Sequence, residues 1–255
     1  MPIALTREVS PGLGACELTH LARVSIDVDL ARAQHRSYEQ ALRDGGYRVE
    51  QLPAGPGMSD SVFIEDIGVV FDELAIITRP GAESRRAETA GVADALATYR
   101  PLHTIVAPGT MDGGDVLVVG RRVFIGRSTR TNADAVRQMR AILAPLGYTV
   151  HELAVNGCLH LKSAVTALAE DLVLANSEWI DTSAFAGCAI VDVDPLEPMA
   201  ANALRLDDRI IYPTAFPRTA ERIAGRGLQL ALVDASELAK AEGAVTCCSL
   251  IMKTA

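Results

Sequence analysis

The stretch VLVVGRRVFI at residues 116–125 places two short apolar runs on either side of a Gly-Arg-Arg turn. Runs of this length and composition predict two strands joined as a hairpin. Residues 132–146 then predict an amphipathic helix that Gly147 ends, and residues 149–155 predict another strand. Together these segments form a unit of hairpin, helix and strand.

The same unit recurs along the chain with a period of roughly 40 to 50 residues. Polar turns separate the apolar runs of the other hairpins, as at Asp72-Glu73, Glu170-Asp171 and Asp207-Asp208. Residues 244–252 predict a last strand, whose hairpin partner would be residues 3–7 at the other end of the chain. The remaining predicted elements are helices at residues 29–44 (with Leu30, Tyr38, Ala41 and Leu42 on its apolar side), 82–98 and 218–224, strands at residues 47–52, 67–70, 74–77, 104–106, 163–168, 172–175, 189–193, 202–206, 210–212 and 229–233, and a loop at residues 51–60.

Repeated units of this kind favour stacking around an axis or along a solenoid. Pairing of the last strand with the first favours a closed ring, so we predict an α/β fold in the form of a five-bladed, pseudo-symmetric propeller. No linker or abrupt change of composition divides the chain, which predicts a single domain over residues 1–255. An ordinary mixed α/β sheet with incidental regularity is the alternative.

The composition is that of a globular protein with a substantial core, since 49% of the residues are hydrophobic and 22% are charged. The formal net charge of −8 argues against a nucleic-acid-binding face and is compatible with a cationic small substrate. The five cysteines match neither a zinc motif nor a disulfide framework, which favours reduced thiols. With neither a signal peptide nor an apolar run of membrane-spanning length in the sequence, we expect a cytoplasmic protein without membrane contacts.

Polar residues cluster where each predicted hairpin begins. If the units surround an axis, these residues meet at its centre and form a pocket with carboxylates, one imidazole and a thiol. The residues in question are Asp60, Glu65, Asp66, Asp112, Asp115, His160, Lys162, Asn202, Cys247 and Cys248.

Buried carboxylates are costly unless a cation pairs with them, and a planar guanidinium fits two carboxylates well. A thiolate is a suitable nucleophile for the sluggish guanidinium carbon, and either Cys247 or Cys248 could supply it. His160 could protonate the leaving nitrogen and then deprotonate a water molecule. Asp112 could orient this imidazole or hold the substrate. Asp115 and Asn202 are more typical of structural residues that bind backbone groups.

Two arginines suggest what the other end of such a substrate carries. Arg85 and Arg130 each follow the second strand of a hairpin and open a helix, so the repeat places them near the same rim. Two guanidinium groups could hold a carboxylate there. A ligand with a carboxylate at one end and a guanidinium at the other is arginine-like.

Several motifs, in this order along the chain, resemble those of dimethylarginine dimethylaminohydrolases. Taken together they are specific, although each alone is weak. They are Phe63-Ile64-Glu65-Asp66, residues 76–86 (IITRPGAESRR), Met111-Asp112-Gly113-Gly114-Asp115, Arg130-Thr131-Asn132, Leu159-His160-Leu161-Lys162, Ala200-Ala201-Asn202 and Thr246-Cys247-Cys248-Ser249.

The resemblance implies the five-bladed α/β propeller (pentein) fold of the guanidine-modifying amidinotransferase superfamily. It also implies hydrolysis of N-omega-methylated arginine to citrulline and a methylamine through a covalent cysteine intermediate, without a cofactor or a metal, and a homodimer. By position, Cys247 is the nucleophile, His160 the general acid and base, and Asp112 its support. The resemblance assigns substrate binding to Leu18 in a mobile lid and to Asp60, Glu65, Asp66, Arg85, Arg130 and the carbonyl of Ala241.

Other functions remain open from the residues. Arginine deiminases and hydrolases of other guanidino compounds would use the same chemistry, but the deiminases are longer. A non-catalytic ribosome-binding propeller would not be expected to hold Cys247, His160 and Asp66 together. Thiolate and imidazole also suit zinc, although an ion on Cys247 and His160 would more readily inhibit than assist.

Overall fold

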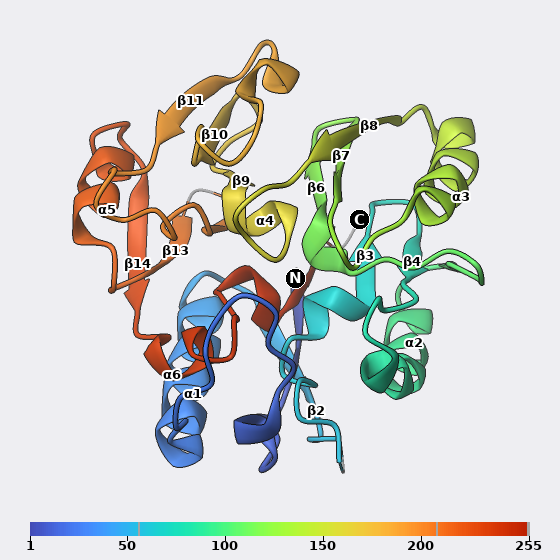
Figure 1. Cartoon of the computed structure of the whole chain (residues 1–255), viewed down its shortest axis with the longest axis horizontal. Coiled ribbons are helices and arrows are strands. Elements are labelled where there is room, and N and C mark those ends of the chain that lie inside the picture. Colours follow the sequence, from blue (N-terminus) through green and yellow to red (C-terminus); the bar gives the residue numbers. More distant parts are fainter. Residues whose placement is uncertain (56, 208, 254–255) are drawn as a thin grey trace.

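The computed structural model describes residues 1–55, 57–207 and 209–253. Pro56, in the predicted loop 51–60, and Asp208, in a predicted turn, lie outside these residues. Within the described part, five three-stranded sheets surround a common centre (Figure 1). The predicted five-bladed α/β propeller is therefore confirmed.

Every sheet has the same internal order. Its first strand is antiparallel to the middle strand, and the middle strand is parallel to the third. The sheets are β15-β1-β2 (Leu250–Met252, Ile3–Arg7, Arg48–Leu52), β3-β4-β5 (Gly68–Val70, Ala75–Ile77, Leu102–Thr104), β6-β7-β8 (Val116–Val119, Arg122–Arg127, Thr149–Ala154), β9-β10-β11 (Val165–Ala167, Leu172–Ala175, Ala189–Asp192) and β12-β13-β14 (Leu204–Leu206, Arg209–Pro213, Gln229–Val233).

A helical crossover connects the two parallel strands of each sheet, as parallel pairing requires. Asn132 caps α3 by accepting a hydrogen bond from the Ala135 N–H, and Asp27 caps α1 in the same way through Asp29 and Leu30. The crossover helices are α1 (Val28–Asp44), α2 (Thr89–Ala97), α3 (Ala133–Leu143), η6 (Thr182–Phe185) and α5 (Pro217–Ala224).

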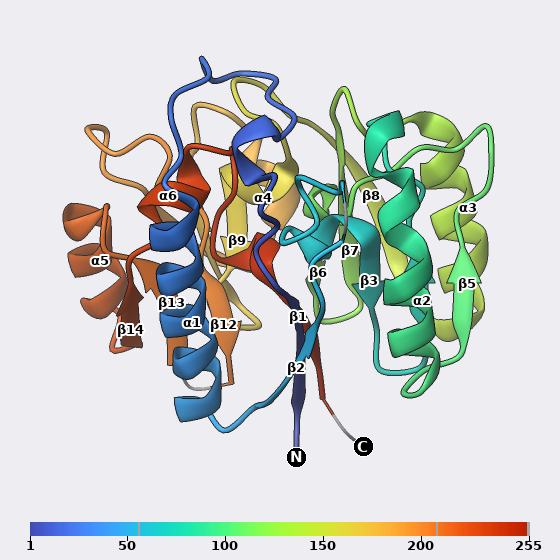
Figure 2. The same cartoon turned by 90° about the horizontal axis from the view of Figure 1, so that it is seen from below.

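The ring closes where the sequence predicted it to close. β1 pairs with β15 in an antiparallel ladder in which Ile3 lies opposite Met252 and Leu5 opposite Leu250. Figure 2 shows both termini on one side of the molecule and the loop of residues 8–27 on the other. The closing sheet therefore crosses the molecule from the termini towards the face that this loop covers.

Several details differ from the sequence prediction. The predicted strands 163–168 and 244–252 begin later, because the helical turns Leu161–Ala164 and Thr246–Cys248 precede β9 and β15. The segment 82–98 is not one α-helix, because the 3₁₀ helix η3 (Glu83–Glu88) precedes α2 and no side chain caps its start at Ala82. The predicted loop 51–60 begins later, since Gln51 and Leu52 pair with β1. Leu30 is 43% exposed instead of lying on the buried side of α1.

Short helical turns occupy the inner ends of the blades. η2 contacts both η4 and η7, and α4 contacts η4, so turns from different blades meet at the centre. These turns are η2 (Ile64–Ile67), η4 (Gly113–Asp115), α4 (Leu161–Ala164) and η7 (Thr246–Cys248); the remaining short elements are η1 (Leu13–Ala15), η5 (Ala144–Leu146) and α6 (Ser236–Ala239). No helix in the described residues is both long and apolar enough to cross a membrane.

Candidate active site

The inner turns carry the predicted catalytic side chains to one cavity. Asp66 lies in η2, Asp112 directly precedes η4, His160 directly precedes α4, and Cys247 lies in η7. Among the described residues, the cavity of about 20 Å³ is lined by Glu17, Asp60, Phe63, Asp66, Arg85, Asp112, Arg130, Leu159, His160, Ala241, Glu242, Gly243 and Cys247. Of the residues to which the resemblance assigns catalysis or substrate binding, all except Leu18 and Glu65 are in this lining. Asp115, Lys162, Asn202 and Cys248, which were also predicted to meet at the centre, are not among the described lining residues.

His160 lies between two buried carboxylates. Its Nε2 is 3.1 Å from Asp112 Oδ2, and its Nδ1 is 3.7 Å from Asp66 Oδ1. Burial disfavours the imidazolium, but Asp66 and the hydrogen bond to Asp112 outweigh it and raise the pKa of His160 to about 9. The resting site therefore holds a protonated imidazole at neutral pH.

The glycines of the Asp112-Gly113-Gly114-Asp115 motif allow this close approach. A Cβ atom on Gly114 would lie 2.6 Å from His160 Nδ1, and one on Gly113 would lie 2.0 Å from the Glu65 carbonyl oxygen. The Gly114 N–H donates to Asp66 Oδ1 over 3.1 Å. Glycine at these two positions is thus a packing requirement of the site.

Cys247 and Cys248 have different surroundings. Cys247 lines the cavity, whereas Cys248 is buried behind it and its thiol points to the Ala244 carbonyl. Burial, together with the negative charges of Glu65 and Asp66, raises the pKa of the Cys247 thiol well above its ordinary range. The thiol is therefore protonated in the resting protein.

Arg85 lines the cavity but is largely occupied by protein acceptors. Its Nη1 is 2.5 Å from Asp66 Oδ2, its Nη2 is 2.9 Å from Glu88 Oε2, and Nη2 also donates to the carbonyls of Asp60 and Phe63. Burial opposes the Asp66 carboxylate, but His160 and Arg85 lower its pKa. In this structure Arg85 serves mainly to keep Asp66 ionised. That Arg85 and Arg130 together bind a carboxylate of the substrate stays a prediction.

The loop of residues 8–27 covers the cavity. The Glu17 N–H donates to both oxygens of Asp60, over 3.2 and 3.1 Å, and Arg130 Nη2 donates to Thr19 Oγ1 over 2.9 Å. Leu18 lies in this loop but packs against a hydrophobic core cluster instead of lining the cavity. An apolar side chain gains more from that packing than from a polar cavity.

Glu242 fixes the same loop from the opposite side. Its carboxylate accepts hydrogen bonds from the consecutive N–H groups of Thr19, His20 and Leu21, at distances between 2.5 and 3.1 Å. Glu242 has a φ of +57°, a left-handed conformation that is uncommon for a residue with a side chain. The loop is thus closed over the cavity by Asp60 and Glu242.

Glu65 lies beside the cavity instead of in its lining. Its Oε1 is 2.6 Å from Lys162 Nζ, and its Oε2 accepts a hydrogen bond from Thr246 Oγ1 over 2.7 Å. Both carboxylate oxygens therefore have protein partners. The prediction that Glu65 binds the substrate stays a prediction.

Asp115 and Asn202 have the structural surroundings expected of them. Asp115 accepts hydrogen bonds from the Ser128 and Thr131 hydroxyls and from the Leu161 N–H. Asn202 accepts from the Thr246 N–H and donates to the Lys162 carbonyl. Each joins turns from neighbouring blades.

A cation could in principle sit among Asp66, Asp112 and His160, whose potential ligand atoms lie within 4.8 Å of one another. These atoms are already engaged with protein groups. Asp66 binds Arg85 and the Gly114 N–H, and Asp112 binds His160 and the Gly81 N–H. The donor set is therefore that of a hydrogen-bonded acid–base network.

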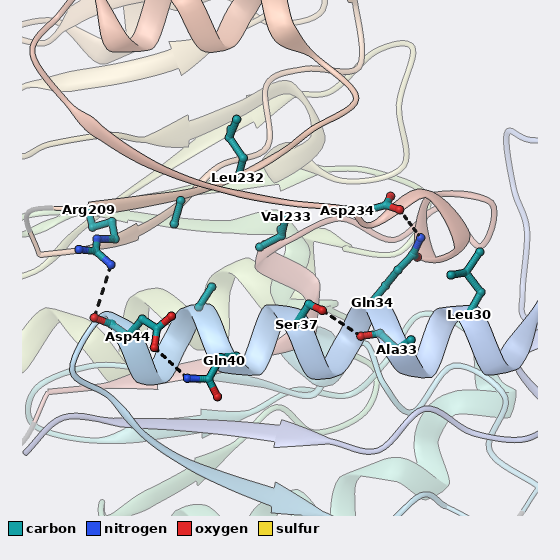
Figure 3. A pocket seen from close by; sticks show the side chains of 12 residues that line it. Leu30, Ala33, Gln34, Ser37, Gln40, Asp44, Arg209, Leu232, Val233 and Asp234 are labelled. Atoms are coloured by element: carbon teal, nitrogen blue, oxygen red, sulfur yellow. Dashed lines mark hydrogen bonds between the residues drawn. The ribbon is translucent and has the colours of Figure 1, made fainter.

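A much larger groove of about 530 Å³ lies elsewhere, between α1 and β14 (Figure 3). Leu30 and Leu232 are exposed along it, and Gln34 donates to Asp234 over 2.8 Å. Neither cysteine nor histidine is among its described lining residues. Size alone therefore does not identify the reactive site in this molecule.

Comparisons with known proteins agree with this geometry. The family described as N,N dimethylarginine dimethylhydrolase, eukaryotic, matches residues 22–188. The N(G),N(G)-dimethylarginine dimethylaminohydrolase of Streptomyces coelicolor is 42% identical over 252 residues, which cover 98% of this chain and 96% of the relative. The chain belongs to the dimethylarginine dimethylaminohydrolase family.

Other members of the dimethylarginine dimethylaminohydrolase family are similar in sequence and in structure. The Pseudomonas aeruginosa enzyme is 39% identical over 226 residues, covering 87% of this chain and 89% of the relative. A crystal structure of a Cys-to-Ser mutant of the P. aeruginosa enzyme with citrulline has a TM-score of 0.94 and 36% identity, and covers 98% of both chains. The similarity therefore extends over the whole propeller.

Five lining residues were missed by the sequence analysis. Four of them are direct neighbours of a predicted residue or belong to one of the motifs that carry the dimethylarginine dimethylaminohydrolase resemblance, and Gly243 lies two residues after Ala241, so proximity in sequence was the available signal. Their side-chain directions were not readable from the sequence. They are Glu17, Phe63, Leu159, Glu242 and Gly243.

Proposed function

We propose that this protein hydrolyses N-omega-methylated arginine to citrulline and a methylamine, with Cys247 as the nucleophile. The observation that carries this proposal is that Cys247, His160, Asp66 and Asp112 line one narrow cavity. Family membership supports the reaction class, since the relatives that match nearly the whole chain are named for it.

The first half of the reaction forms a covalent intermediate. The substrate guanidinium lies against Asp66, the Cys247 thiol loses its proton to solvent, and the resulting thiolate attacks the central carbon of the guanidinium. His160, protonated because its pKa is about 9, donates a proton to the methylated nitrogen. The C–N bond breaks, the methylamine leaves, and an S-alkyl thiouronium remains on Cys247.

The second half releases the product. His160, now neutral, takes a proton from a water molecule, and the resulting hydroxide attacks the thiouronium carbon. The C–S bond then breaks and its electron pair returns to Cys247. The proton on the former water oxygen passes to the sulfur, which leaves citrulline and restores the Cys247 thiol. Asp112, 3.1 Å from His160 Nε2, keeps the imidazole oriented in both halves.

The thiolate is assisted by the substrate. The carboxylates around Cys247 raise the pKa of its thiol in the empty site. A bound guanidinium adds a positive charge close to the sulfur and lowers that pKa. A neutral ligand would not, so the site discriminates in favour of cations.

The other end of the substrate is held at the rim of the cavity. Arg130, with Arg85 beside it, binds the α-carboxylate. Asp60 and the carbonyl of Ala241 bind the α-ammonium group. Leu18 contacts the substrate when the loop of residues 8–27 rearranges around it.

An assay of citrulline formation tests the proposal and the nature of the substrate. Arginine, monomethylarginine and asymmetric dimethylarginine are compared at equal concentrations. Turnover of the methylated forms well above that of arginine is expected. Preferred turnover of arginine would make the protein a deiminase, and turnover of none of them would refute the proposal.

We also infer a cytoplasmic location and a homodimer. The five free cysteines, all within the described residues, support a reducing compartment. The dimer rests on family resemblance, and the net charge of −8 supports a small-molecule partner over a nucleic acid. Sedimentation at several protein concentrations would test the dimer, and fractionation of the source cells would test the location.

A further inference from the structure

Lys162 connects two blades immediately behind the cavity. It lies in α4, two residues after His160, and its Nζ is 2.6 Å from Glu65 Oε1 in η2. The two side chains are only 14% and 10% exposed. A buried ion pair of this kind needs both partners, because removal of one leaves an uncompensated charge.

The pair is coupled to the turn that holds the nucleophile. Thr246, which begins η7 and directly precedes Cys247, donates its hydroxyl to Glu65 Oε2 over 2.7 Å. Its N–H donates to Asn202 Oδ1 over 3.0 Å, and Asn202 Nδ2 donates to the Lys162 carbonyl over 3.0 Å. Lys162, Glu65, Thr246 and Asn202 thus form a closed ring of contacts.

Charge compensation around Cys247 is divided between two cations. Arg85 neutralises Asp66, and Lys162 neutralises Glu65. Without Lys162, the negative charge of ionised Glu65 would oppose formation of a thiolate on Cys247. Glu65 is close to this sulfur because it accepts a hydrogen bond from Thr246, the residue before Cys247. The titratable and charged groups that surround Cys247 are Glu65 and Asp66 from η2, Lys162 from α4, His160, Asp112, Cys248, Tyr38 from α1, and the cavity residues Glu17, Asp60, Arg85, Arg130 and Glu242.

We propose that Lys162 is a positioning residue of the reaction, which acts on Cys247 through Glu65 and Thr246. It holds Glu65 in place as the hydrogen-bond acceptor of Thr246, which fixes η7, and its positive charge offsets the negative charge next to the sulfur. The proposal rests on the proposed function for its catalytic meaning, but its effect on the thiol exists without turnover.

The test compares Lys162→Met with Lys162→Arg. Alkylation of Cys247 by iodoacetamide is followed between about pH 6 and pH 10, and the modified cysteine is identified by peptide mass spectrometry. In Lys162→Met, the rate below the thiol pKa should fall roughly tenfold, which corresponds to an upward shift of one pH unit in the profile. In Lys162→Arg, which keeps the charge, the profile should stay close to that of the wild type.

A double variant distinguishes an effect of charge from a general loss of structure. Glu65→Gln/Lys162→Met replaces the ion pair by two neutral side chains, and the alkylation profile should return towards the wild-type position. Circular dichroism and thermal unfolding verify that each variant is folded. If Lys162→Met alone does not fold, the double variant and Lys162→Arg still test the proposal.

The outcomes are distinct. An unmoved profile in Lys162→Met, or a loss of rate that Lys162→Arg shows to the same extent, would reduce Lys162 to a structural residue and overturn the proposal. A double variant that keeps the shifted profile would overturn the charge argument as well. If the wild type forms no citrulline from any guanidine, the proposed function fails, whereas the alkylation result on Lys162 stands by itself.

Discussion

The inner ends and the outer faces of the blades use charged residues in opposite ways. At the centre, Arg85 binds Asp66 and Glu88, and all three side chains are at most 6% exposed. On the outside, Arg32 binds Asp29 over 3.0 Å, with the two side chains 38% and 91% exposed. The outer pair is weak because water screens it, whereas the inner group cannot lose a member without a large penalty.

This difference shows how one repeated unit supports both a fold and a site. The strands and crossover helices are held by apolar packing, which tolerates variation between blades. The inner turns depend on a few partnered charges, some within one blade, as in Arg85 with Asp66, and some between blades, as in Lys162 with Glu65. Experiments that remove charges at the two places should therefore give very different results.

The largest effect is expected at the nucleophile. Cys247→Ser should lower citrulline formation by about 10³-fold or more, because a hydroxyl without a strong base attacks a guanidinium poorly. Its thermal stability should remain near that of the wild type. Cys248→Ala is the matched control and should keep most of the activity. Retained turnover in Cys247→Ser would refute the mechanism.

Next comes the stability contrast between the two kinds of ion pair. Arg85→Met should lower the free energy of unfolding by about 3–5 kcal/mol, since Asp66 and Glu88 are left buried without their cation. Arg32→Met should lower it by less than about 1 kcal/mol. Urea denaturation of both variants measures the difference. Equal losses would contradict the comparison.

A smaller effect concerns the protonation of His160. Asp112→Asn removes a hydrogen bond that helps raise the pKa of His160 to about 9, so the alkaline limb of the pH–kcat profile should move to lower pH. The value of kcat at neutral pH should fall roughly 10- to 100-fold. An alkaline limb in the wild-type position would show that Asp112 does not act through the imidazole.

The same shift has a consequence for stability. The folded-state pKa of His160 is raised from its ordinary value of 6.5 to about 9. Protonation of His160 therefore stabilises the folded protein fully below pH 6.5, and this contribution is lost as the pH rises through about 9. Unfolding measured across this window should show a smaller slope in Asp112→Asn than in the wild type. An identical slope would mean that another group titrates there.

The smallest effect is expected in the loop over the cavity. Glu242→Gln weakens the three hydrogen bonds from Thr19, His20 and Leu21, so amide exchange in residues 19–21 should become faster. KM should rise by about two- to fivefold because the contact is exposed to solvent. Glu83→Gln, at an exposed helix position, is the control. Unchanged exchange would show that Glu242 does not hold the loop.

Much of the propeller could be predicted because its signals are local. Short apolar runs around polar turns indicate each hairpin, and the run at Leu250–Met252 lacked a local partner, which indicated pairing with β1. The split of segment 82–98 was less predictable, since Ala82 gives η3 no side-chain cap. Local patterns describe elements better than they describe irregular helix starts.

Side-chain partners were harder to predict than side-chain positions. The motifs located Glu65 correctly at the inner end of a blade, yet its carboxylate faces Lys162, a residue 97 positions along the chain. Likewise, the role of Glu242 depends on N–H groups more than 220 positions away. Such choices are decided by long-range packing, which residue spacing does not encode.

The seam between β1 and β15 has a consequence for synthesis. During translation β1 is made early, whereas its partner β15 is made about 240 residues later. Cys247 lies just before β15, in the chain region made last. A nascent chain therefore carries an unpaired edge on β1 until its last residues are made. Closure of the ring and completion of the cavity that Cys247 lines thus arrive together.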